Sequence, residues 1–204
     1  MFPLGSALLP HERLPLHVFE ERYRIMIGDC LANDRRFGVV LIERGSEVGG
    51  GDIRNGVGTV AEIEVASPMS DGRFGILATG THRLTVERWL PDSPYPKALV
   101  HLETEAESES EDLSTEVAAA LAALRELRQL WADLGEGLAL PEVVPLGADF
   151  SKQVWRLCSA TPIGVLDRQR LLAAGGTKRR LELLQKFMGE QRGDFIALLQ
   201  QRSE

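Results

Sequence analysis

Two cysteines and four histidines are the residues of this sequence best suited to metal binding or nucleophilic chemistry. Cys30 and Cys158 lie far apart, and neither a Cys-x-x-Cys nor a His-Glu-x-x-His pattern occurs, so the spacing predicts no zinc site. Both cysteines have apolar neighbours, which is typical of buried thiols rather than of a disulfide framework or a reactive nucleophile. We therefore predict no metal ligands and no cysteine chemistry.

Phosphate binding and covalent catalysis are not indicated either. The phosphate-binding pattern Gly-x-x-x-x-Gly-Lys-Ser/Thr does not occur. The glycine-rich residues 49–51 and 175–178 lack its order, and predict a hairpin loop and a junction between two helices. A serine–lysine pair needs a lysine whose pKa is lowered in a shaped site, and none of the four lysines has such a sequence context. We predict no catalytic residues, no cofactor and no enzymatic activity.

One charged group is a candidate for contact with another chain. Glu21 and Arg22 stand at the start of a predicted helix, and they point away from its core side if Phe19 and Tyr23 face inward. The alternative is a solvated helix turn, in which Glu20 lies near the positive end of the helix dipole.

Three apolar residues in turns are candidates for an exposed adhesive surface. Trp89 and Tyr95 bracket the proline-rich residues 91–94, and Met69 lies in another turn. Exposed apolar side chains are what an unfolded chain would bind. Core packing is the alternative for Trp89, and an edge position with an exposed hydroxyl is the alternative for Tyr95.

The first half of the sequence is rich in predicted β-strands. The alternation in residues 61–65 places Ile63 and Val65 on one face of a strand. Residues 70–72 and 80–81 predict tight turns, since glycine permits positive φ. The predicted strands are residues 37–43, 59–66, 73–79, 82–90 and 98–102.

One helix is predicted within this β-rich half, from about residue 18 to residue 31. Its apolar residues recur at intervals of three and four and would close the open side of a small barrel. They are Phe19, Tyr23, Met26, Ile27 and Cys30.

The second half predicts a helical bundle. An apolar stripe over residues 113–134 ends at Gly135, a typical helix stop. A helix over residues 150–160 follows, and Thr161-Pro162 predicts the start of the next one, which runs to about residue 174. Thr177 is the expected cap of a last helix, which Gly189 and Gly193 would weaken, kink or divide.

Charge and hydropathy narrow the class of protein. Residues 103–116 hold seven acidic and no basic side chains, which predicts a solvated linker, and the rest of the chain carries 23 acidic and 23 basic residues. This balance argues against nucleic acid as a partner. No apolar run reaches the roughly 20 residues needed to cross a bilayer, and no secretory leader is expected, so cytoplasm is the predicted location.

Several segments together resemble the amino-terminal, substrate-binding domain of the Lon proteases. The first is the proline-interrupted start, residues 2–23, and the others follow in the family's order. They are residues 37–42, 47–51, 57–63, 71–73, 80–84, 166–172 and 180–181.

The resemblance implies an α+β fold: a β-rich, PUA-like pseudobarrel with one packed helix, followed by an α-helical bundle. The expected boundaries are 1–104 for the barrel, 105–112 for the acidic linker and 113–204 for the bundle. It also implies a stand-alone form that lacks the ATPase and protease domains, and a role in substrate handling for Glu21 and Arg22.

The resulting hypothesis is a non-catalytic module that binds unfolded or misfolded polypeptide or a specific protein partner, as an adaptor or holdase. Two alternatives remain open. One is a small-molecule binder with a pocket between barrel and bundle, and the other is a PUA-like RNA-binding module.

Overall fold

The computed structural model describes residues 1–45, 51–103, 112–135 and 149–202. It divides into two compact units, which we call the barrel unit, Met1–Thr104, and the helical unit, Glu105–Glu204. The described part of the barrel unit holds a six-stranded sheet and one helix, and that of the helical unit holds four helices. No helix in the described ranges is both long and apolar enough to pass through a bilayer.

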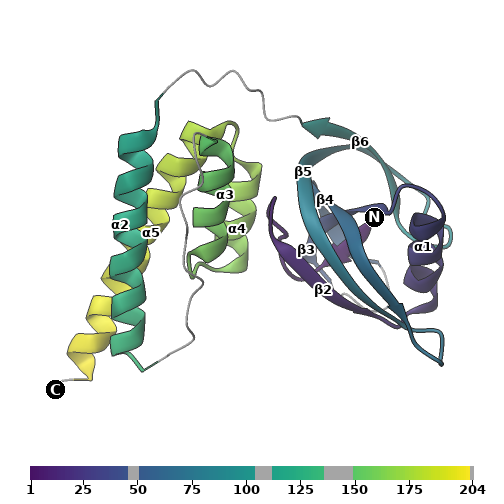
Figure 1. The fold of residues 1–204 in the computed structure, drawn as a ribbon, viewed down its shortest axis with the longest axis horizontal. Coiled ribbons are helices and arrows are strands. Elements are labelled where there is room, and N and C mark those ends of the chain that lie inside the picture. Colours follow the sequence, from purple (N-terminus) through teal and green to yellow (C-terminus); the bar gives the residue numbers. More distant parts are fainter. Residues whose placement is uncertain (46–50, 104–111, 136–148, 203–204) are drawn as a thin grey trace. The chain divides into compact units, whose positions relative to one another are not determined.

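The sheet of the barrel unit is curved (Figure 1) and has the order β1-β3-β4-β5-β2, with β6 also paired to β5. β1 runs parallel to β3, and the other pairs are antiparallel. β2 pairs with the first part of β5 and lies at the edge of the sheet. The strands are β1 (Phe2–Leu4), β2 (Arg13–Val18), β3 (Arg36–Arg44), β4 (Ile53–Pro68), β5 (Phe74–Leu90) and β6 (Lys97–Glu103).

The two amino-terminal strands were not predicted. β1 has only three residues, and β2 carries Pro15, a residue that sheets accept at an edge. The proline-rich start of the chain is therefore part of the sheet.

The predicted turn at residues 80–81 is wrong, because β5 continues through it as one strand. Gly80 meets the backbone of the segment before β2: its N–H donates to the Glu12 carbonyl (2.9 Å), and its carbonyl accepts from the His11 N–H (2.8 Å). A Cβ at this position would clash with the carbonyl oxygen of Leu9. The glycine thus permits a close backbone approach rather than a turn.

The turn at residues 70–72 is confirmed, with Gly72 at φ +80°. The prediction that Ile63 and Val65 lie on the same face of the strand is wrong. Ile63 is buried, but a register shift between these two residues turns Val65 outward, where it is 50% exposed. A β-bulge of this kind interrupts the alternation of inward and outward side chains along the strand.

Helix α1, Glu21–Ala32, lies beside the curved sheet (Figure 1) and buries Tyr23, Met26 and Ile27 as predicted. These side chains join the main core, where the ring of Phe2 stacks on that of Tyr23 at a centroid distance of 4.2 Å. The helix begins later than residue 18 because Val18 is still paired with Phe74 in the sheet.

The predicted inward position of Phe19 is also wrong. The residue lies between β2 and α1, and its side chain is 52% exposed. It therefore belongs to neither the sheet core nor the buried face of the helix. Cys30 is half-buried on α1, and burial raises the pKa of its thiol to about 11.

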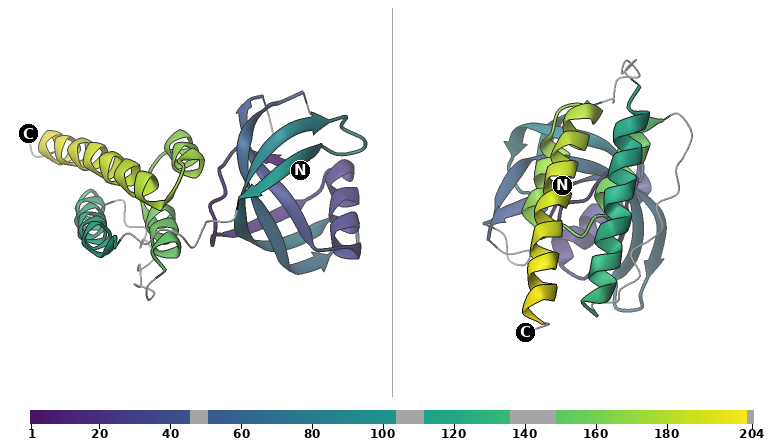
Figure 2. Two further views of the ribbon diagram at one scale, coloured as in Figure 1. Left: turned by 90° about the horizontal axis from the view of Figure 1, so that it is seen from above. Right: turned by 90° about the vertical axis from the view of Figure 1, so that its left-hand side faces the viewer.

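The helical unit consists of α2 (Ser114–Asp133), α3 (Phe150–Ala160), α4 (Val165–Ala173) and α5 (Thr177–Gln201). α2 and α5 run side by side in the same direction (Figure 2). Contacts from Glu126 to Arg192 (2.6 Å) and from Trp131 to Phe195 (centroids 5.2 Å) join them. Gly135, at φ +76°, follows the end of α2 as predicted.

Three expectations for the helices are wrong. Thr161-Pro162 does not begin a helix, because the Thr161 hydroxyl donates to the Leu157 carbonyl (2.7 Å) at the end of α3 and α4 begins only after Gly164. Thr177 is not a cap: Gly176 holds that position. Gly189 and Gly193 do not divide the last helix, since α5 runs unbroken through both. Each glycine destabilises a helix by about 1 kcal/mol, which is less than the stabilisation from burying the apolar face of α5.

Arg180 holds the turn between α4 and α5 together. Its guanidinium is buried, lies 3.6 Å from the ring centroid of Trp155, and donates to the carbonyls of Leu171 (3.3 Å) and Ala174 (3.2 Å). The last carbonyls of α4 are thereby satisfied inside the unit.

Most of the expected acidic linker lies outside the described residues, as does most of the expected loop at residues 49–51. Asp112 is described, and its carboxylate accepts a hydrogen bond from the Ser114 N–H (3.0 Å) where α2 begins.

Candidate functional site

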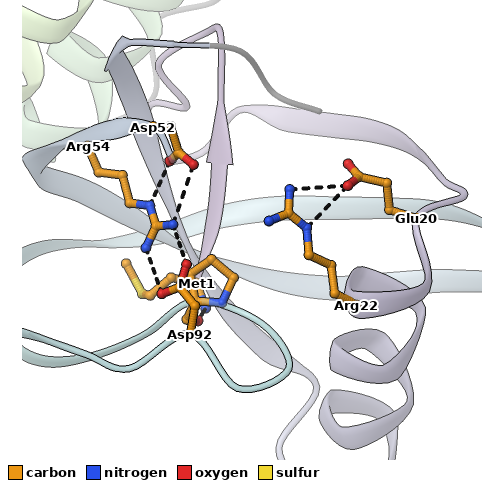
Figure 3. Close-up of polar contacts among 7 residues, drawn as sticks. Met1, Glu20, Arg22, Asp52, Arg54 and Asp92 are labelled. Atoms are coloured by element: carbon orange, nitrogen blue, oxygen red, sulfur yellow. Dashed lines mark hydrogen bonds and ion pairs between the residues drawn. The ribbon is translucent and has the colours of Figure 1, made fainter. Parts of the chain in front are cut away.

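Glu21 and Arg22 occupy the first turn of α1. Glu21 is exposed. Arg22 donates to the Glu20 carboxylate (Nε–Oε2 3.2 Å; Figure 3). The guanidinium carbon of Arg22 lies 4.6 Å from the ring centroid of Tyr23. Arg22 is thus fixed against its own helix, while Glu21 presents its carboxylate to solvent.

A cluster around Arg54 joins β4 to the loop between β5 and β6 (Figure 3). Its guanidinium lies between the carboxylates of Asp52 (2.6 Å) and Asp92 (2.5 Å). The hydrogen bond from Arg54 holds the pKa of Asp92 below its usual value. For Asp52, burial acts in the opposite direction, but the hydrogen bonds and the nearby positive charge still leave the pKa lowered.

Trp89 belongs to this structural cluster. It is half-buried, packs against the small core of Val40, Val60 and Leu84, and has the Arg54 guanidinium carbon 5.0 Å from its ring centroid. Trp89 thus takes part in core packing, which was the alternative to an exposed binding position.

Tyr95 is also engaged within the barrel unit. Its hydroxyl donates to the Asp29 carboxylate on α1 (2.7 Å), and this hydrogen bond is the main reason that its pKa is raised to about 12. Next to it, the carbonyl of Pro96 accepts from the amine of Met1 (2.7 Å). Tyr95 therefore fastens the β5–β6 loop to the helix.

Met69, in contrast, is 41% exposed at the hairpin between β4 and β5. Its backbone is fixed, since its N–H donates to the Arg73 carbonyl (2.8 Å) and its carbonyl accepts from the Gly72 N–H (3.0 Å). Its methyl carbon lies 3.8 Å from where a Cβ on Gly75 would stand. The side chain therefore lies over the outward side of β5.

The outward side of β2, β5 and β4 carries a row of apolar side chains next to Met69. Pro15 pairs with Leu77, which pairs with Val65, so that the three side chains lie on one face. In the neighbouring row His17 pairs with Gly75, and the ring of Phe19 lies 6.1 Å from that of His17. We call this set the outer apolar surface: Pro15, Phe19, Val65, Met69 and Leu77.

Three pairs of oppositely charged side chains lie around the outer apolar surface. Contacts join Arg13 to Glu64 (3.9 Å) and Arg36 to Glu62 (3.3 Å) near the apolar row. At the hairpin turn, Arg73 meets Asp71 at 2.6 Å. These three pairs therefore add no net positive or negative charge to the rim.

Of the five residues predicted to bind polypeptide, Met69 lies on the outer apolar surface and Glu21 is exposed close to it in sequence, two residues after Phe19. Arg22, Trp89 and Tyr95 are engaged in contacts within the barrel unit. From their spacing, Phe19 was assigned to the packed face of the helix, and Val65 to the same strand face as Ile63. Only the helix start at Glu21 and the bulge after Ile63 place them at the surface.

Within the described ranges, no group of three or more His, Cys, Asp or Glu side chains is arranged to hold a metal ion.

The chain matches the family model of the ATP-dependent protease La (LON) substrate-binding domain over residues 1–190. It is 25% identical over 193 residues to a Lon protease of Rhizobium meliloti, covering 92% of this chain and 23% of that protein. It is 30% identical over 112 residues to a LON peptidase N-terminal domain and RING finger protein of Schizosaccharomyces pombe, covering 48% of this chain and 23% of that protein. The chain thus spans about a quarter of the length of these relatives.

Solved structures show the same fold. A Lon N-terminal domain protein from Xanthomonas campestris superposes with a TM-score of 0.66 and 27% identity, covering 92% of this chain and 96% of that one. The N-terminal domain of a Mycobacterium avium complex Lon protease gives a TM-score of 0.61 at 18% identity, covering the same shares. The predicted family and α+β fold class are confirmed, and the chain belongs to the LON substrate-binding domain family.

Proposed function

We propose that this protein binds extended segments of unfolded polypeptide on its outer apolar surface, without ATP and without cleavage, and acts as an adaptor or holdase. Membership of the LON substrate-binding domain family supports a protein-binding module. The observation that carries the proposal is the exposure of Phe19, Val65 and Met69 on one side of the sheet.

Exposed apolar side chains that lie together are costly in water and are typical of surfaces that bind other chains. An unfolded segment offers apolar side chains that its own fold does not bury. Since the three ion pairs at the rim carry no net charge, burial of apolar area would supply most of the affinity, and we expect binding to change little with salt.

A titration of labelled, permanently unfolded polypeptide against the purified protein tests the proposal. Val65→Thr keeps the shape and strand preference of the side chain but makes it polar. We expect it to weaken binding about three- to tenfold. Leu99→Thr is the matched control, because Leu99 is 44% exposed, close to the 50% of Val65, but lies on β6.

Glu21→Lys and Arg22→Glu separate the two parts of the predicted site. Weaker binding with Glu21→Lys would extend the surface to the start of α1, since Glu21 is exposed there. Arg22→Glu also breaks the contact with Glu20, so its fold must be checked first by thermal unfolding. Absence of saturable binding by the unchanged protein, or hydrolysis of ATP or casein by it, would overturn the proposal.

A further inference from the structure

We propose that Met69 is a site of reversible oxidation that weakens polypeptide binding at the outer apolar surface, an inference that rests on the function proposed above. It concerns the regulation of that surface by peroxide-type oxidants.

Met69 differs from the other methionines in its accessibility. The chain has four, and all are described. Met26 and Met188 are each 1% exposed in the cores of the two units, and Met1 packs against the small core that contains Val40. Met69 is 41% exposed. An oxidant therefore reaches its sulfur without any opening of the fold, whereas the sulfurs of Met26 and Met188 become accessible only when the core opens.

The surroundings of Met69 allow its sulfur to be oxidised without loss of the local structure. Its backbone is held by the hydrogen bonds to Arg73 and Gly72, and its side chain lies across the surface over Gly75. The thioether is not enclosed by the core, so an added oxygen atom has space. Val65 and Phe19, on the same side of the sheet, stay apolar.

The chemical step is a two-electron transfer of oxygen. The sulfur lone pair attacks one oxygen of hydrogen peroxide, the O–O bond breaks, an S–O bond forms, and the peroxide is reduced to water. Two thiols reverse it by giving the thioether, a disulfide and water, as in methionine sulfoxide reductases. The sulfoxide is polar and strongly hydrated, so burying it against an apolar ligand is costly.

The test combines a mass readout with a binding readout. The folded full-length protein is exposed to dilute hydrogen peroxide, and the oxidation of each methionine is followed by peptide mass mapping. We expect Met69 to be oxidised at least about tenfold faster than Met26 and Met188, because those two require opening of the core. Equal rates, or slower oxidation of Met69, would overturn the assignment.

Binding of labelled unfolded polypeptide is then measured before and after peroxide. We expect about a five- to tenfold loss of affinity in the unchanged protein, and recovery after treatment with a methionine sulfoxide reductase and a thiol. Met69→Leu cannot form the sulfoxide, so its affinity should be the same before and after peroxide. A loss in this variant equal to that of the unchanged protein would place the effect elsewhere and overturn the proposal.

The two proposals fail in different ways. If the untreated protein does not bind polypeptide, the proposed function falls and a regulatory effect on it falls too, while mass mapping still decides whether Met69 is the selectively oxidised residue. If the untreated protein binds and its fully oxidised form binds equally well, the proposed function stands and the regulation is overturned.

Discussion

Tyr95 illustrates at the scale of one residue how a side chain that looks suited to binding is used within the fold. Its hydroxyl donates to Asp29, and its pKa is raised to about 12. We expect Asp29→Asn to lower this pKa towards the ordinary value of about 10, because the variant removes the carboxylate that accepts the hydrogen bond from the neutral phenol and, with it, the negative charge that opposes ionisation. The measurement is an absorbance titration of the phenolate.

Tyr23 is the second of the two tyrosines, and burial raises its pKa to about 12 as well. Tyr95→Phe therefore serves as the reference that reports Tyr23 alone. If Asp29→Asn leaves both transitions near pH 12, the hydrogen bond from Tyr95 is not what sets its titration.

The Arg54 cluster predicts a pH-dependent contribution to stability. The pKa values of Asp52 and Asp92 are lowered in the folded state, so folding favours their ionised forms. This contribution is fully present above their unfolded pKa of about 3.9 and is lost progressively as the pH falls from there through their lower folded-state pKa values.

Asp92→Asn tests this contribution. We expect the variant to be less stable than the unchanged protein at neutral pH, with a difference that shrinks in acid, measured by urea unfolding at both pH values. A difference that stays constant as Asp92 is protonated would contradict the assignment of that carboxylate to the contact with Arg54.

Some single residues could be predicted from the sequence and others could not. The burial of Tyr23 and the exposure of Glu21 follow from helical spacing. The pairing of Trp89 with Arg54 links residues distant in sequence, and only the pairing of the strands brings them together. The buried position of Arg180 is unusual for a charged residue, and depends on the ring of Trp155 and on carbonyls at the end of α4.

At the scale of an element, α1 is held to the sheet mainly by its buried face. Tyr23→Ala removes the ring that stacks on Phe2 and leaves a cavity, so we expect a loss of about 3–5 kcal/mol in the free energy of unfolding. Ile25→Ala, on the exposed side of the same helix, should cost less than about 1 kcal/mol. Urea unfolding of both variants makes the comparison, and equal losses would show that the helix does not depend on this face.

The elements that could be predicted are those whose apolar residues recur with one clear helical period. The stripe over residues 113–134 gave α2 almost to the residue, and residues 150–160 gave α3. Elements shaped by distant contacts could not be predicted. Gly80 predicts a break in β5, and only the contact with the segment near Leu9 explains why the strand continues through it. β2 contains a proline that is acceptable only because the strand lies at an edge.

At the scale of the whole molecule, we expect polypeptide binding to be a property of the barrel unit alone. The outer apolar surface lies entirely in the barrel unit. We therefore expect residues 1–103 alone to fold, with a dispersed amide spectrum, and to bind unfolded polypeptide within about threefold of the full chain. Residues 112–204 alone should not bind. Binding that requires both pieces would contradict the placement of the site.

Pro15 gives the edge strand β2 a property that matters for a protein with apolar side chains in water. An unpaired strand edge invites another strand to extend the sheet, and chains that do so aggregate. A proline removes one N–H from the hydrogen-bonding pattern that such growth would need. If the outer apolar surface binds another chain as proposed, the backbone of β2 would discourage that chain from joining the sheet. The proline at this edge would thus allow a binding face on β2 without inviting the protein to assemble with itself along the strand.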